Sequence, residues 1–193
     1  MHRLASSFVL GYHGCDRAVG ERLLRGEAFR ESRNAYDWLG PGVYFWEANP
    51  LRAMAFAEES RVKRRGNIRE PFVVGAVLEL GYCLDLTTEA GITQVRNAYA
   101  SLAEVTAKAG LALPTNSDDQ LRRNLDCAVI DWLHKIVGTE GRAPIDTVRG
   151  VFVEGAAAYP GSGIREKTHI QIAVRNGACV KGVFRVPERD LRG

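Results

Sequence analysis

Long apolar runs are missing from this sequence of 193 residues. No segment approaches the roughly 20 consecutive apolar residues that a membrane-spanning helix needs, because charged residues interrupt every long segment. The first nine residues hold one arginine and a short apolar patch without a cleavage signature. We therefore expect no signal peptide and no membrane partner.

Paired cysteines are also missing. Cys15, Cys83, Cys127 and Cys179 are scattered, with no Cys-x-x-Cys pair and no histidine at ligand spacing. This pattern predicts neither a disulfide framework nor a structural zinc site, and it favours the reducing cytoplasm. No Gly-x-Gly-x-x-Gly follows a strand candidate and no Walker-type lysine is present, so the two commonest nucleotide-binding folds are disfavoured.

The composition is that of an ordinary globular protein, with 46% hydrophobic and 25% charged residues. Such a chain can bury a core, which excludes disordered, fibrous and collagen-like classes. The length predicts a single domain spanning residues 1–193. A net charge of +3 permits a polyanionic partner without requiring one.

Strand and helix patterns do not alternate regularly along the chain. Strands are predicted at 7–13, 43–46, 72–80, 148–154, 169–175 and 179–186, and helices at 17–25, from 50 into a basic run at 61–69, at 93–108 and at 118–137. Asn176-Gly177 predicts a tight turn between the last two strands. This order favours an α+β fold with a helical insert at about 85–140 over a doubly wound parallel sheet. The basic run is either a solvated helix end or a polyanion contact.

Three predicted strands each carry one polar side chain among apolar neighbours. His13 ends the first strand, Tyr44 lies within Gly-Val-Tyr-Phe-Trp, and Gln171 lies within Thr-His-Ile-Gln-Ile-Ala-Val. Burying such a group without a partner costs about 1–3 kcal/mol. Each should therefore face a polar cleft or a built-in partner.

These positions carry a resemblance to a known family. The run Tyr12–Gly14, the run Gly40–Phe45 about 30 residues later and the late strand with Gln171 resemble the diphtheria-toxin and poly(ADP-ribose) polymerase branch of the ADP-ribosyltransferases. That branch carries a His, Tyr and Glu triad on three strands. The resemblance covers roughly 7–60 and 148–186, and it implies a split mixed or antiparallel sheet. The chain also resembles small stand-alone bacterial members, some of which are toxins or phage-defence effectors with a neutralising antitoxin.

The resemblance implies NAD as co-substrate and a catalytic set of His13, Tyr44 and Gln171. His13 would contact a ribose hydroxyl of NAD, and the backbone of Gly14 would bind the nicotinamide carboxamide. Tyr44 would stack on the nicotinamide, with Phe56 as second aromatic unless Phe56 is ordinary core. We therefore expect the His13 and Tyr44 rings to face each other across one groove, with Tyr44 carrying little of the core.

Gln171 stands where polymer-forming relatives carry Glu. Its amide can hydrogen-bond a ribose hydroxyl but cannot take a proton. Glycosidic cleavage passes through an oxocarbenium-like state that needs charge stabilisation more than a base. We therefore expect transfer of one ADP-ribose, with nicotinamide released. Glu154, Glu166 and His169 could supply a base, or they are ordinary surface and ion-pair residues.

Several alternatives remain open from the sequence. The acceptor is a protein or a nucleic acid, and NAD glycohydrolysis or RNA 2′-phosphotransfer could occur on the same fold. The latter needs convergent cations, for which Arg30, Arg33 and Arg165 are candidates. A binding module for NAD or ADP-ribose without chemistry is the third alternative. Trp38 and Trp46 flank the turn before Tyr44 and could form only its hydrophobic floor.

Overall fold

The computed structural model describes residues 8–62, 68–119 and 121–192. The strands are β1 (Phe8–Asp16), β2 (Val43–Glu47), β3 (Pro71–Glu79), β4 (Cys83–Asp85), β5 (Thr147–Phe152), β6 (His169–Val174) and β7 (Val180–Arg185). The helices are α1 (Arg17–Leu24), α2 (Pro50–Val62), α3 (Glu89–Lys108) and α4 (Asn124–Thr139), and two 3₁₀ turns span Gly177–Cys179 and Glu188–Leu191. The predicted α+β class is confirmed. The first seven residues and most of the basic run lie outside the described ranges.

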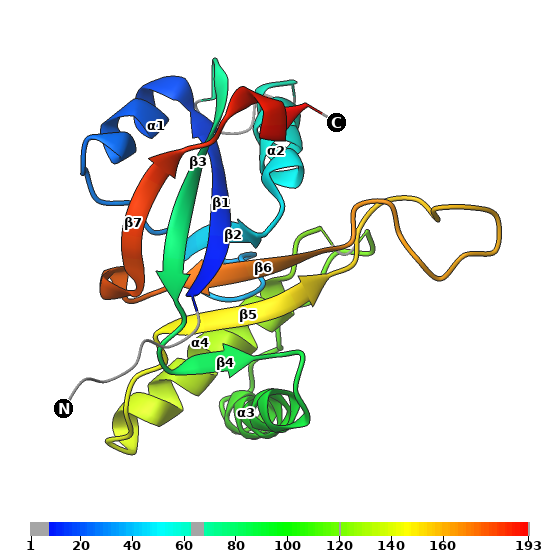
Figure 1. The fold of residues 1–193 in the computed structure, drawn as a ribbon. Helices are drawn as coiled ribbons and strands as arrows, with labels where there is room; N and C mark the ends of the chain where they lie inside the picture. The colour runs from blue at the N-terminus through cyan, green and yellow to red at the C-terminus, as the bar shows by residue number, and fades with distance from the viewer. Residues whose placement is uncertain (1–7, 63–67, 120, 193) are drawn as a thin grey trace.

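The strands form one mixed sheet in the order β4-β5-β6-β2-β1-β3-β7 (Figure 1). Among the strands of the described residues, only β4 and β5 pair in parallel. β1 pairs with β3 along its whole length, from Phe8 to Asp16, whereas its ladder with β2 holds only two pairs, Gly11↔Glu47 and Tyr12↔Trp46. The sheet therefore divides at β1 and β2 into a β4-β5-β6-β2 half and a β1-β3-β7 half.

Helices cover each half separately. α3 and α4 pack on β4-β5-β6-β2 through a core that includes Leu84, Ile130 and Val148. α2 packs on β1 and β3 through Ala53 and Val73. A further core contains residues of both halves, namely Phe45, Ala76, Leu78, Ile172 and Val174. The two halves are therefore folded toward each other. No helix in the described part of the chain is long and apolar enough to cross a membrane.

Local hydrogen bonds set several boundaries that the sequence pattern misplaced. The Asp16 carboxylate accepts from Ala18 N at 2.9 Å and caps α1 as predicted. α4 begins at Asn124 rather than at 118, because Asn116 Oδ1 accepts from Leu125 N at 2.9 Å and closes the preceding residues into a loop. α3 begins at Glu89 rather than at 93, because Thr88 Oγ1 caps it by accepting from Gly91 N at 3.1 Å.

The predicted tight turn at Asn176-Gly177 does not make a hairpin. Asn176 Oδ1 accepts from Ala178 N at 3.1 Å and starts a 3₁₀ turn. β6 pairs with β2 and β5, whereas β7 pairs with β3. The turn therefore carries the chain from one half of the sheet to the other.

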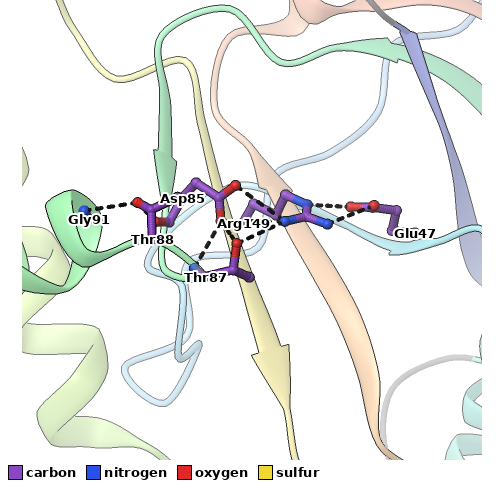
Figure 2. A network of polar contacts seen from close by, with 6 residues as sticks. All are labelled: Glu47, Asp85, Thr87, Thr88, Gly91 and Arg149. Atoms are coloured by element: carbon purple, nitrogen blue, oxygen red, sulfur yellow. Dashed lines mark hydrogen bonds and ion pairs between the residues drawn. The ribbon is translucent and has the colours of Figure 1, made fainter.

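A polar network ties three strands together across β6 (Figure 2). Arg149 on β5 donates to Glu47 on β2 through Nε at 2.6 Å and Nη2 at 2.9 Å. Its Nη1 lies 3.2 Å from Asp85 Oδ2 on β4. The hydrogen bond with Glu47 raises the pKa of Arg149. Burial alone would raise the pKa of Asp85, but hydrogen bonds from Thr87 and the charge of Arg149 lower it overall.

We expect Arg149→Met to lower the free energy of unfolding by about 3 kcal/mol, because it leaves two largely buried carboxylates without their cation. The side chains of Arg149 and Glu47 are each only 18% exposed. The matched control is Lys181→Met, whose pair with Glu79 is 40% and 33% exposed and should contribute less than about 1 kcal/mol. Urea unfolding measures both losses, and equal losses would contradict the role given to Arg149.

The Arg149 contribution also has a defined pH dependence. A carboxyl group whose folded pKa is lowered adds stability above its unfolded pKa, and this stability is lost as pH falls through the folded value. The Asp85 share of the difference between wild type and Arg149→Met should therefore shrink below about pH 4. Urea unfolding at pH 7 and at pH 3 measures the change.

Candidate functional site

The two sequence motifs meet at one hydrogen bond. His13 Nδ1 lies 2.9 Å from the main-chain oxygen of Tyr44. A carbonyl only accepts, so Nδ1 carries the proton and the neutral ring offers Nε2 as an acceptor. Burial lowers the pKa of His13, which keeps the ring neutral at pH 7.

Gly14 lies just past the end of the β1–β2 ladder. The Leu10 carbonyl accepts from Ala48 N at 2.8 Å on the β2 side of β1. In a strand, the backbone N–H and C=O groups of every second residue face the same neighbouring strand. The backbone N–H and C=O groups of Tyr12 and Gly14 therefore also face the β2 side of β1. The ladder ends at Tyr12. A Cβ at Gly14 would lie 2.2 Å from the Ala53 oxygen, so only glycine lets α2 pack here.

The ring of Tyr44 belongs to the core, contrary to the sequence expectation. It packs against the core under α4, and its hydroxyl donates to the Gly40 carbonyl at 2.8 Å and accepts from Leu39 N at 3.0 Å. Burial raises the pKa of Tyr44 well above its usual value, so the phenol stays protonated. The hydroxyl therefore holds the turn before β2, and the prediction that Tyr44 carries little of the core is wrong.

The His13 and Tyr44 rings lie on opposite faces of β2. The His13 ring packs against Phe45 and Phe29, with centroids 5.7 and 5.5 Å away. Tyr44 and Phe45 are neighbours along a strand, so their side chains point to opposite faces. The expected single groove between the two rings is therefore absent. Tyr44 therefore does not face His13 in the way that the family resemblance implies for a nicotinamide site.

Gln171 is held in one orientation by Trp38. A Cβ at Gly150 would lie 2.7 Å from the Trp38 ring, so the absence of a side chain at Gly150 leaves the space that the indole occupies. Trp38 Nε1 donates to Gln171 Oε1 at 2.6 Å. Because an indole N–H only donates, the amide oxygen is fixed there and the NH₂ group is the end left for a ligand. Gln171 can therefore act on a ligand as a donor.

A continuous row of five rings, here called the aromatic row, occupies the same face as Gln171. Its members in order are Trp38, Phe152, His169, Trp46 and Phe56. Successive ring centroids are 5.2, 5.5, 6.2 and 4.8 Å apart. Phe56, which the sequence offered as second aromatic beside Tyr44, instead packs on Trp46 and is 39% exposed. The row joins β2, β5, β6 and α2, which no pattern local to one segment could show.

A guanidinium group lies near each end of the aromatic row. Arg123 lies 5.3 Å from the Trp38 ring and 4.5 Å from the Phe152 ring, within cation–π range. Arg52 lies 6.0 Å from the Trp46 ring and donates to Glu154 at 2.8 Å. Arg123 directly precedes α4, so the helical insert places a charge against Trp38, the hydrogen-bond partner of Gln171.

The candidate bases occupy different surroundings. Glu154 is held by Arg52. His169 donates from Nδ1 to the Lys167 carbonyl at 2.6 Å, and burial lowers its pKa, so its ring is neutral. Glu166 is exposed in a projecting arm, residues 153–168, that extends beyond β5 and β6 (Figure 1). His169 is thus the one of these three that belongs to the aromatic row.

The three arginines considered for phosphotransfer do not converge. Arg33 pairs with Glu31 at 2.9 Å and lines a pocket with Arg175, which follows β6. Arg165 lies in the arm that precedes β6. Arg33 and Arg165 therefore lie at opposite ends of β6. Arg30 is exposed in the segment between α1 and β2.

A pocket of about 400 Å³ opens near His13 on the face opposite Tyr44. Its apolar lining includes Phe29, Val43 and Val183. Phe29 contacts the His13 ring edge-on. The pocket shares Glu31 and Arg175 with the pocket that Arg33 lines, which measures about 380 Å³. Of the sequence-predicted site residues, Arg33 alone lines one of these two pockets, and the Phe29 ring separates the His13 imidazole from the other.

We expect Tyr44→Phe to lower the free energy of unfolding by about 1–3 kcal/mol, because it strands a buried N–H and C=O in the Leu39-Gly40 turn. Tyr82→Phe is the control, since Tyr82 is 68% exposed and should change little. Thermal and urea unfolding compare the two variants. A Tyr44→Phe protein as stable as Tyr82→Phe would show that the hydroxyl does not hold the turn.

Comparisons with known proteins give no relative. No family model matches the chain, and neither a curated protein nor a solved structure matches it. The resemblance to the ADP-ribosyltransferases therefore rests on the sequence motifs alone. The His13–Tyr44 contact and the strand order describe how these motifs are placed relative to one another.

Proposed function

We propose that this protein, through a sheet of the ADP-ribosyltransferase type, transfers a single ADP-ribose from NAD to a macromolecular acceptor and releases nicotinamide. The observation that carries the proposal is the His13 Nδ1 contact with the Tyr44 carbonyl at the end of the β1–β2 ladder. β1, β2 and β6, which hold the three motif residues, are neighbours in the sheet. Residues more than a hundred positions apart in the sequence thereby lie on neighbouring strands.

The proposed roles follow from the hydrogen-bonding capacity of each group. His13 Nε2 accepts from a ribose hydroxyl, and the pocket beside Phe29 receives the adenosine end. Phe56, which is 39% exposed and packs on the buried Trp46, replaces Tyr44 as the aromatic surface for the nicotinamide side. The Gln171 NH₂ group donates to a hydroxyl of the ribose that reacts.

The reaction breaks the bond between ribose C1′ and the nicotinamide nitrogen. The electron pair leaves with the nicotinamide, which becomes neutral, and C1′ gains oxocarbenium character. A nucleophile of the acceptor then forms the new bond to C1′ and loses its proton. Gln171 cannot take this proton, so an acceptor that is already a good nucleophile suits the site.

The proposal is tested by incubating the full chain with labelled NAD and a cell lysate. Free nicotinamide and a labelled macromolecule are expected, and separate protease and nuclease digestion identifies the acceptor class. His13→Asn should retain a donor to the Tyr44 carbonyl but lose the Nε2 acceptor. Nicotinamide release should fall about tenfold in His13→Asn. No nicotinamide release by the wild type would rule the function out.

Gln171 supplies a second, independent test. Gln171→Ala should slow nicotinamide release about tenfold and weaken NAD binding less, because its hydrogen bond matters most as charge develops on the ribose. Gln171→Glu should raise the rate, since a carboxylate keeps the Trp38 N–H bond and adds negative charge beside the ribose. Wild-type turnover in Gln171→Ala would show that another residue holds the ribose.

A binding module without chemistry is the second candidate function. It is favoured by the donor-only amide of Gln171 and by the absence of a free carboxylate at that position. In that case NAD raises the melting temperature of the wild type, while no nicotinamide appears at high protein concentration.

A further inference from the structure

Four buried nitrogen atoms with no hydrogen-bond partner gather at one end of the aromatic row. They are Trp46 Nε1, Arg52 Nε and Nη1, and His169 Nε2, and only one other such side-chain atom occurs among the described residues. The Trp46 and His169 rings are 6.2 Å apart, and Arg52 is 6.0 Å from the Trp46 ring. Trp46 is 3% exposed and His169 is 6% exposed. Buried polar groups without partners are rare, so a cluster of them calls for a partner from outside the chain, either water or a ligand.

The chemistry of the four atoms is fixed by their neighbours. An indole N–H and a guanidinium N–H can only donate. His169 uses Nδ1–H on the Lys167 carbonyl, so its Nε2 is a bare acceptor. The cluster therefore offers three donors beside one acceptor.

The charges around the cluster are already balanced. Arg52 donates to Glu154 at 2.8 Å and lies 3.8 Å from Glu59, which in turn pairs with Lys167 at 2.8 Å. Two positive and two negative side chains thus leave no excess charge for an ionic ligand. A neutral group with an oxygen acceptor next to an N–H donor matches the cluster best.

We propose that Trp46, Arg52 and His169 bind a planar primary carboxamide. Its oxygen accepts from Arg52 and Trp46, and its NH₂ group donates to His169 Nε2. The identity of the carboxamide, the nicotinamide of NAD, rests on the proposed function. This assignment differs from the one that the family resemblance implies, which gives the carboxamide to the backbone of Gly14.

The place of the cluster in the fold suits this role. His169 and Gln171 are two residues apart on β6 and face the same side, so a carboxamide here lies beside the proposed ribose donor. Phe56 packs on Trp46 and is 39% exposed, so it forms the outer layer of the cluster. A ligand reaches the four nitrogen atoms by displacing this ring.

The test uses nicotinamide with the ¹⁵N-labelled full chain, observed through the three tryptophan indole N–H signals. The Trp46 signal should move downfield, and Trp132, whose Nε1 already donates to Ser101 at 3.1 Å, serves as the internal control. Benzamide should act like nicotinamide. Nicotinate should bind at least about tenfold more weakly, because its second oxygen meets the His169 lone pair.

Variants separate recognition from structure. His169→Leu should lower nicotinamide affinity about tenfold and abolish the preference over nicotinate, and Trp46→Phe should also weaken binding. The matched control is Lys181→Met, which removes a lysine–glutamate ion pair between β7 and β3 and leaves the four nitrogen atoms and their charged neighbours unchanged. Affinity in Lys181→Met should equal that of the wild type.

The outcomes are distinct from those of the proposed function. An unmoved Trp46 signal, equal binding of nicotinate, or a response confined to the Gly14 amide overturns the carboxamide site. If the wild type then still releases nicotinamide from NAD, the proposed function survives without it. A Trp46 response without any release from NAD keeps the site and overturns the transferase.

Discussion

One side-chain hydrogen bond allows the sheet to open. Where the β1–β2 ladder would continue, the Tyr44 carbonyl accepts from the His13 imidazole instead of a backbone amide. A buried carbonyl without a partner would be costly, so this substitution lets the two halves of the sheet part without leaving an orphan acceptor. The same bond fixes the tautomer of His13, and the ladder ends before Gly14, which is buried against α2. The geometry of the candidate site depends on this single contact.

The sequence was sufficient to place the motif residues on strands but not to choose their faces. Alternation alone predicts that Tyr44 and Trp46 share one face of β2 and that Phe45 takes the other. Which face is filled depends on α4, which lies in the insert that no motif described. The insert packs over Tyr44, so the residue expected to stack on a ligand packs against the core under α4, and Trp46 is buried against α2.

The same limit applies to the fold. The strand predicted at 72–80 is found as Pro71–Glu79, because a long apolar run with β-branched residues is a strong local signal. The three-residue strand β4 has no such signal, and it forms by pairing with β5 more than sixty residues later. The chain likewise passes at Asn176 from one half of the sheet to the other, because β6 pairs with β2 and β5 whereas β7 pairs with β3. These features are decided by contacts distant in sequence.

The insert also bears on the chemistry proposed for the site. Trp38 holds the Gln171 oxygen and so makes Gln171 a donor, and Arg123 of the insert packs on Trp38. His13 and His169 each commit Nδ1–H to a backbone carbonyl, and burial lowers the pKa of both, which makes them weak bases. A site with amide donors and weak bases can stabilise a departing nicotinamide but activates a hydroxyl poorly. This balance favours one transfer to a ready nucleophile over repeated transfer to ribose.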